Sequence, residues 1–202
     1  DYAPKKSFTA PFIFKGKNIE RVNIPNPPKT NKNAVGYKVT DGAKYPTIVQ
    51  AGDVLYVNYF IEKNKITRLE QRRLINGAFT PPTLMSASEN LMVNWADRPR
   101  FALGHDDSSL VTWLESNGHG YGIKYMFSRE SGAAYTEAKW LHQDQEGAEH
   151  GFVSLVPLKL GGFFAVWLQG GAFGTEDAYQ TSLMGLVINA DGVLGDEFVL
   201  DD

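Results

Sequence analysis

Three residues of this 202-residue chain combine a type and a position suited to proton transfer: Asp97, Glu149 and His150. Asp97 lies in the segment 94–99, before an apolar run, and Glu149-His150 directly precedes another such run. A buried carboxylate with a raised pKa is suited to act as a general acid or base. The alternative for Asp97 is structural, since its carboxylate would also accept backbone or Trp N–H bonds and fix the loop. For His150 the alternative is a hydrogen-bonded structural histidine.

Other kinds of chemistry lack a matching motif in the sequence. Cysteine is absent, which excludes disulfides and thiolate chemistry. We find no His/Cys zinc spacing, phosphate-binding loop or G-x-S-x-G elbow. The run His105-Asp106-Asp107 suggests a metal hypothesis, but acidic turns are common and no further ligands can be named. We therefore expect neither a metal nor a cofactor.

The elements that must position these residues repeat along the chain. Tyr59, Trp113 and Trp167 each close an apolar run typical of a strand, and they are 54 residues apart in both intervals. A small turn rich in Gly, Asp or Ser precedes each run, and another apolar stretch precedes that turn. A fixed period of about 50 residues is typical of a propeller or solenoid built from one supersecondary unit. Each unit has room for about four short strands, the content of one propeller blade.

The period predicts an all-β fold, a β-propeller with about three four-stranded antiparallel blades of a six-bladed ring. We place the blades at about 44–88, 89–143 and 144–202, after an extended N-terminal arm at 1–43 that could add a closing strand. Asn76-Gly77 is well suited to a hairpin turn in the first blade. Asn189-Ala190-Asp191-Gly192 is a second hairpin signal, in the third blade.

The segment Ser128-Arg129-Glu130-Ser131-Gly132-Ala133-Ala134-Tyr135 resembles the Asp box, S-x-D-x-G-x-x-W, of sialidases and other bacterial-neuraminidase-repeat (BNR) proteins. Glu130 replaces the Asp and Tyr135 replaces the Trp. The resemblance implies a structural hairpin between two strands, in which Ser128, Glu130, Gly132 and Tyr135 stabilise the turn. We expect the Glu130 carboxylate to accept backbone N–H bonds and the Tyr135 ring to pack against the sheet.

Three further segments resemble bacterial sialidase-like propeller proteins over roughly residues 44–202. They are Asn94-Trp95-Ala96-Asp97, Trp113-Leu114-Glu115 and Glu149-His150-Gly151-Phe152-Val153-Ser154-Leu155. The resemblance implies that Asp97 is a general acid/base near the ring axis, with Glu149 and His150 lining the same opening. It also leads us to expect substrate contacts from Lys44, Trp95 and Arg98.

Lys44 departs from the sialidase pattern. Sialidases open their first blade with R-I-P, whereas this chain has Lys44-Tyr45-Pro46 at the equivalent place. An ammonium group cannot reproduce the two parallel hydrogen bonds with which an arginine holds a substrate carboxylate. Sialidase chemistry also needs two more arginines and a Tyr nucleophile with its Glu partner, which the family partly supplies from later blades. We therefore expect a second half-propeller from another chain, a second copy or a missing C-terminal half.

Charge is distributed unevenly along the chain. Residues 1–38 carry eight Lys and Arg against two acidic residues, whereas the remainder carries 12 Lys and Arg against 21 Asp and Glu. A basic arm next to an acidic body indicates packing on that body or on a partner subunit. Nucleic-acid binding is not expected, because the acidic body would repel phosphates. No apolar run reaches 18 residues, so no membrane span is expected.

Two functions are compatible with these observations. The first is a non-catalytic sialidase-like propeller module that binds a glycan or serves as an assembly subunit, and we favour it because the R-I-P arginine is replaced. The alternative is an exo-glycosidase, a sialidase-type hydrolase, with Asp97 as general acid/base and the remaining catalytic residues outside this chain. Either function would suit a secreted or periplasmic protein whose signal peptide has been removed.

Overall fold

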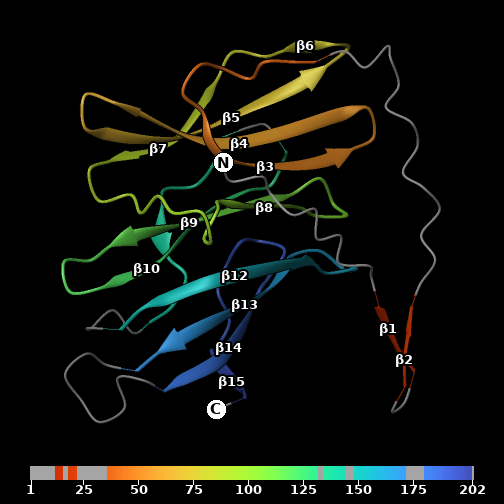
Figure 1. The fold of residues 1–202 in the computed structure, drawn as a ribbon, viewed down its shortest axis with the longest axis vertical. Helices are drawn as coiled ribbons and strands as arrows, with labels where there is room; N and C mark the ends of the chain where they lie inside the picture. The colour runs from red at the N-terminus through yellow and green to blue at the C-terminus, as the bar shows by residue number, and fades with distance from the viewer. Residues whose placement is uncertain are drawn as a thin grey trace, which may run out of the picture. The chain divides into compact units, whose positions relative to one another are not determined.

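The computed structural model describes residues 12–15, 18–21, 36–131, 134–143, 148–171 and 180–201 (Figure 1). The chain divides into two compact units, Asp1–Lys38 and Val39–Asp202. Within the first unit, β1 (Phe12–Lys15) and β2 (Asn18–Arg21) form an antiparallel pair. The role of the arm 1–43 as a closing strand stays a prediction. The described part of the chain is all strand and loop, without helix.

The second unit begins with a five-stranded antiparallel sheet. Its strands are β3 (Lys44–Ala51), β4 (Val54–Lys63), β5 (Ile66–Ile75), β6 (Ala78–Phe79) and β7 (Thr83–Ser88). The short strands β6 and β7 pair with opposite ends of β5, so together they replace a single fourth strand. Asn76 and Gly77 both have positive φ, 50° and 77°, which is the geometry of a two-residue type I′ hairpin. The hairpin predicted from this dipeptide is confirmed.

The second and third sheets are four-stranded antiparallel meanders. The second holds β8 (Arg100–Leu103), β9 (Ser109–Ser116), β10 (Tyr121–Ser128) and β11 (Lys139–Trp140). The third holds β12 (His150–Pro157), β13 (Phe163–Gly170), β14 (Thr181–Ile188) and β15 (Phe198–Asp201). Spatial order follows chain order in both sheets. The first strands lie nearest to one another, since β8 contacts both β3 and β12 (Figure 1), as a radial arrangement requires.

Two hydrophobic cores lie between successive sheets. One contains Tyr56, Phe60 and Leu69 of the first sheet together with Val111 and Trp113 of the second. The other joins the second sheet to the third.

Strand β9 contributes to both cores. Its residues Val111 and Trp113 face the first sheet, and Leu110 and Leu114 face the third, where they meet Phe163. All four side chains are at most 3% exposed. This pattern follows from the period of two along a strand whose two faces are both covered.

The three repeating aromatic residues occupy equivalent places in the second strands of the sheets. Tyr59, Trp113 and Trp167 are 0%, 2% and 0% exposed. Trp113 lies in the core with the first sheet, and Trp167 lies in the core with the second sheet, so each points toward the preceding sheet. The predicted all-β propeller fold with about three antiparallel blades is confirmed.

Tyr59, by the same alternation, points away from the second sheet. Its hydroxyl donates to Glu70 Oε2 at 2.9 Å, and Arg68 Nε donates to Glu70 Oε1 at 2.9 Å. Burial, together with the hydrogen bond and negative charge of Glu70, raises the pKa of Tyr59 to about 12. The first sheet therefore has a polar cluster on its outer face, at the position where the other sheets have tryptophan.

The outer face of the third sheet is apolar. It carries Val156, Leu168, Val187, Phe198 and Leu200, which are 38–54% exposed. The ring of Phe198 stacks on that of Phe164, with 6.0 Å between centroids. Exposed apolar surface of this extent on one sheet is typical of an interface.

Truncation of a buried tryptophan should lower the free energy of unfolding more than truncation of an exposed one. Trp167→Ala should lower the free energy of unfolding by about 3–5 kcal/mol, because it leaves a cavity between two sheets. Trp95→Ala is the matched control, because its ring is 76% exposed and should change stability by about 0.5 kcal/mol or less. Urea denaturation followed by circular dichroism measures both. Equal losses would contradict the two-core packing.

The raised pKa of Tyr59 predicts a loss of stability at alkaline pH. Because folding favours the protonated hydroxyl, its contribution is complete below the usual tyrosine pKa near 10 and is lost as pH rises toward 12. Over this range the melting temperature of the parent protein should fall more steeply than that of Tyr59→Phe, which cannot ionise at this position. Parallel pH profiles of the two proteins would rule out this assignment.

Candidate functional site

The residues predicted to act on a ligand gather at one end of the sheets. This end, which we term the site edge, is where β3, β8 and β12 begin, at Lys44, Arg100 and His150. The antiparallel order brings the β4–β5 and β9–β10 turns to the same end. Asp97 precedes β8 by three residues, and Glu149 directly precedes β12. Loops clustered at one end of a rigid scaffold are the usual setting of binding sites.

Two inner strands carry a β-bulge immediately after the site edge. The register shifts between Lys44 and Thr47 in β3 and between Gly151 and Ser154 in β12. Each bulge holds an aromatic residue at positive φ, Tyr45 at 49° and Phe152 at 55°. Positive φ is uncommon for residues other than glycine and is found at sites where the surrounding structure enforces it. Each bulge therefore changes the direction of one aromatic side chain, and the two residues occupy corresponding positions in β3 and β12.

Asp97 joins the second sheet to the bulge of the third. Its side chain is buried, and its Oδ1 accepts the backbone N–H of Phe152 at 2.6 Å. Asn94 closes the loop, because its Oδ1 accepts the N–H groups of Ala96 and Asp97, each at 2.7 Å. Its Nδ2 also lies 3.4 Å from Asp97 Oδ2. This arrangement matches the structural alternative for Asp97, and a catalytic role stays a prediction.

Glu149 and Asp97 both lie beside Tyr121, a residue that the sequence did not single out. The Tyr121 hydroxyl donates to Glu149 Oε2 at 3.1 Å. Burial is the main cause that raises the pKa of Tyr121, followed by the hydrogen bond and charge of Glu149 and the charge of Asp97. A Cβ at Gly151 would lie 3.3 Å from Asp97 Oδ1 and 3.5 Å from the Tyr121 ring. Asp97 and Glu149 therefore converge around Gly151 and Tyr121, and only Glu149 is exposed.

His150 lies inside the protein. Its ring is fully buried and stacks on that of His142, with 3.8 Å between centroids and 2° between planes. His142 Nε2 accepts the backbone N–H of Ile123 at 3.0 Å. A Cβ at Gly122 would lie 2.6 Å from that nitrogen, so the glycine permits the close approach. A catalytic role for His150 stays a prediction, and His142 is a stacking partner that the sequence did not predict.

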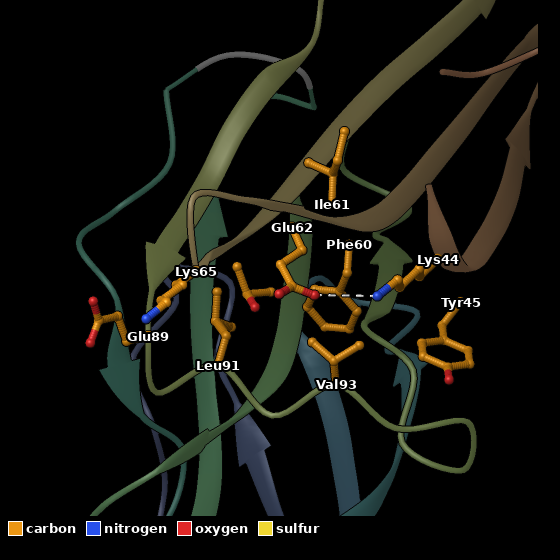
Figure 2. Close-up of a pocket in the computed structure, with 10 residues that line it drawn as sticks. Lys44, Tyr45, Phe60, Ile61, Glu62, Lys65, Glu89, Leu91 and Val93 are labelled. Carbon is orange, nitrogen blue, oxygen red and sulfur yellow. Dashed lines mark hydrogen bonds and ion pairs between the residues drawn. The ribbon is translucent and has the colours of Figure 1, made fainter. Parts of the chain in front are cut away.

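Lys44 lines a cavity of about 440 Å³ between the first and second sheets (Figure 2). Its Nζ is 3.3 Å from Glu62 Oε2, and both side chains are more than half exposed. Lys65 and Glu89 add one charge of each sign to the lining, and Leu91 belongs to the core below. Asp97, Glu149 and His150 are not among the residues that line this cavity.

Trp95 and Arg98 stay with Asp97 in the loop before β8. The ring of Trp95 is 76% exposed, and Arg98 is also exposed. Glu115, which ends the Trp113-Leu114-Glu115 segment, accepts the indole N–H of Trp113 at 3.2 Å. The site edge thus presents an exposed aromatic ring and an exposed guanidinium in one loop.

The segment 128–135 lies at the opposite edge, between β10 and β11. Ser128 Oγ donates to the backbone carbonyl of Glu130 at 2.7 Å, while the Glu130 side chain is exposed. Tyr135 packs against the core between the first two sheets, and its hydroxyl lies 3.0 Å from Ser109 Oγ. Gly132 lies outside the described residues. The Glu130 contact in the structure is therefore made by the backbone, where we expected the carboxylate.

The acidic turn 105–107 also lies at the opposite edge. Asp106 Oδ1 accepts the hydroxyl of Ser108 at 2.6 Å, and this bond is the main cause that lowers the pKa of Asp106. Across the described ranges, no group of three or more His, Asp or Glu residues could hold a metal ion. In the same part of the chain, no helix has the length and apolar character needed to cross a membrane.

Comparison with known proteins places the fold. No family model matches the chain, and no curated protein matches it. Among solved structures, it is similar to an α-L-arabinanase from Penicillium chrysogenum complexed with arabinobiose, at 12% identity and a TM-score of 0.55. That match covers 77% of this chain and 49% of the arabinanase, so the chain spans about half its length.

A putative glycoside hydrolase from Parabacteroides distasonis is similar at 11% identity and a TM-score of 0.43, covering 78% of this chain and 72% of that one. The arabinanase is a β-propeller glycoside hydrolase, and at this identity the likeness concerns the fold alone. It agrees with the propeller predicted from the 54-residue period.

The buried bond from Asp97 to Phe152 predicts a graded effect of substitution. Asp97→Ala should lower the free energy of unfolding by about 1–3 kcal/mol, because the Phe152 N–H loses its acceptor. Asp97→Asn keeps an acceptor oxygen and should cost less. The exposed Asp196→Ala is the matched control, with an expected change of about 0.5 kcal/mol or less. Chemical denaturation of the three variants tests this order, and an Asp97→Ala protein as stable as the control would contradict it.

Proposed function

We propose that this chain is a carbohydrate-binding β-propeller module whose ligand binds at the site edge. The observation that carries the proposal is the exposed ring of Trp95 in the loop that also holds Asp97 and Arg98. A sugar ring offers a face of C–H groups, which packs on an aromatic ring, and hydroxyls at its rim, which bond to charged side chains. The fold likeness to an arabinanase complexed with arabinobiose supports the same ligand class.

Charge at the site edge also suits a hydroxyl-rich ligand. Glu149 is exposed and is held by the Tyr121 hydroxyl, so its orientation is fixed while one oxygen remains to accept from a ligand. Arg98, in the same loop as Trp95, offers several N–H donors. Hydrogen bonds to charged groups are stronger than those between neutral groups, which favours a ligand with many hydroxyls.

The second candidate is an exo-glycosidase of sialidase type with Asp97 as general acid/base. The observation in its favour is that Asp97 and Glu149 approach the same tyrosine, Tyr121, since sialidase chemistry combines an Asp acid with a Tyr and its Glu partner. Two observations favour the binding module instead. Asp97 Oδ1 is already bonded to a backbone N–H, and Lys44 is paired with Glu62.

Assembly with a second half-propeller is part of the proposal. Each interface within the chain forms where the aromatic face of one sheet packs on the preceding sheet. The outer face of the third sheet, with Leu168, Val187 and Phe198, is suited to receive a further sheet of this kind. Another chain, a second copy or a further part of the same protein would supply it. A secreted or periplasmic location suits such a module and stays a prediction.

Loss of the exposed ring should weaken carbohydrate binding. Trp95→Ala should raise the Kd for a neutral oligosaccharide about tenfold, equivalent to ~1.4 kcal/mol, while Trp95→Phe retains part of the affinity. Leu160→Ala is the control, since Leu160 is 95% exposed in the β12–β13 turn at the opposite edge. Isothermal titration with arabinobiose and with sialyllactose measures binding.

The same samples separate the two candidate functions. A binding module should leave sialyllactose intact, whereas release of sialic acid that is abolished by Asp97→Asn would establish the glycosidase. Absence of binding to any oligosaccharide in a broad panel would contradict both candidates.

A further inference from the structure

The cavity between the first two sheets has the dimensions and the construction of a ligand site. Its volume of about 440 Å³ falls within the range of about 300–1,000 Å³ that is usual for small-molecule pockets. Its apolar side includes Phe60 and Leu91, which are 1% and 6% exposed and belong to the core below. Figure 2 shows Leu91 and Val93 on one side of the cavity, facing Lys65, Glu62 and Lys44.

The cavity wall is supported by backbone hydrogen bonds. The segment 89–93 is tied to β9 by hydrogen bonds from Met92 N to Leu114 O at 3.0 Å and from Ser116 N to Asn90 O at 2.9 Å. On the facing side, the bulge of β3 holds Tyr45 at positive φ, and this residue also lines the cavity. A preformed site of this kind binds without the entropy cost of ordering its loops.

The charges of the lining are balanced. Lys44 and Lys65 supply two ammonium groups, and Glu62 and Glu89 supply two carboxylates. The contact between Lys44 and Glu62 is solvent-exposed, so it contributes at most about 1 kcal/mol and can open for a ligand. An acidic or a cationic ligand would be attracted by two of these groups and repelled by the other two, so it would gain little net attraction while it pays to desolvate its charge.

A neutral diol satisfies both charge types at once. Of two adjacent hydroxyls, one can donate to a carboxylate such as Glu62 while its neighbour accepts from an ammonium such as Lys44. The apolar wall at Leu91 and Val93 would contact the C–H face of the same ring.

We propose that this cavity is a subsite for a neutral sugar residue with free adjacent hydroxyls, and that it discriminates against acidic sugars. The inference rests on the proposed carbohydrate-binding function and adds a second position of contact, apart from Trp95 and Asp97. In this site Lys44 would bind a diol hydroxyl. The sialidase resemblance implied that the arginine at this position holds a substrate carboxylate.

The experiment compares matched substitutions in one turn. Lys65→Met removes a lining ammonium, whereas Lys63→Met makes the same change two residues away, at an exposed position outside the lining. Glu62→Gln removes a lining carboxylate. Titration calorimetry uses arabinobiose and xylobiose as neutral probes and digalacturonate as the acidic probe.

The expected results are specific to the cavity. The parent protein should bind at least one neutral probe about tenfold more tightly than digalacturonate. Lys65→Met and Glu62→Gln should each weaken the neutral probe several-fold, and Lys63→Met should leave its Kd unchanged. Glu62→Gln should in addition narrow the preference for neutral over acidic probe, an effect that lost stability cannot produce.

Three other outcomes overturn the inference in distinguishable ways. Neutral binding that Trp95→Ala weakens but Lys65→Met and Glu62→Gln leave unchanged would remove the cavity subsite and keep the proposed function. Equal or tighter binding of digalacturonate would likewise reject a charge-balanced diol site. Absence of binding to all three probes would reject the subsite and weaken the proposed function with it.

Discussion

Burial of strand β9 on both faces is the constraint on which the rest of the structure depends. Val111 and Trp113 lie in the core with the first sheet, and Leu110 and Leu114 lie in the core with the third. A one-residue slip of β9 against its paired strands β8 and β10 would exchange its two faces between the two cores. The alternating contacts therefore fix the register of β9 in its own sheet. The three sheets are therefore held in one stack, and their first strands are brought together at the site edge.

The site edge depends on contacts between sheets more than on any single sheet. Asp97, from the loop before the second sheet, accepts the Phe152 N–H of the third, and Gly151 leaves room for Asp97 beside Tyr121. The cavity likewise needs β3 on one side and the loop 89–93 on the other. Core packing thus sets the geometry of the candidate site, which explains how exposed, charged residues can lie on a rigid support.

Much of the fold could be predicted from the sequence because its signals are local or periodic. The aromatic period identified the second strand of each sheet, and Asn-Gly at 76–77 identified a hairpin. Pairing of two short strands with β5 was not predicted, since strands of two and six residues leave no clear pattern. Tyr121 and His142 were missed because their roles come from partners distant in sequence, Glu149 and His150. Glu130 differed from expectation, because its backbone carbonyl accepts the Ser128 hydroxyl while its carboxylate, which we expected to accept backbone N–H bonds, is exposed.

A ligand of the carbohydrate class should bind at the site edge of this propeller segment. The most direct measurement is the change in backbone amide resonances of the isotopically labelled chain as arabinobiose is added. We expect the amide resonances of residues 61–67 and 89–98 to shift, and those of the opposite-edge turns 51–54 and 104–108 to stay unchanged. Shifts confined to those opposite-edge turns, with the loop around Trp95 unaffected, would contradict it.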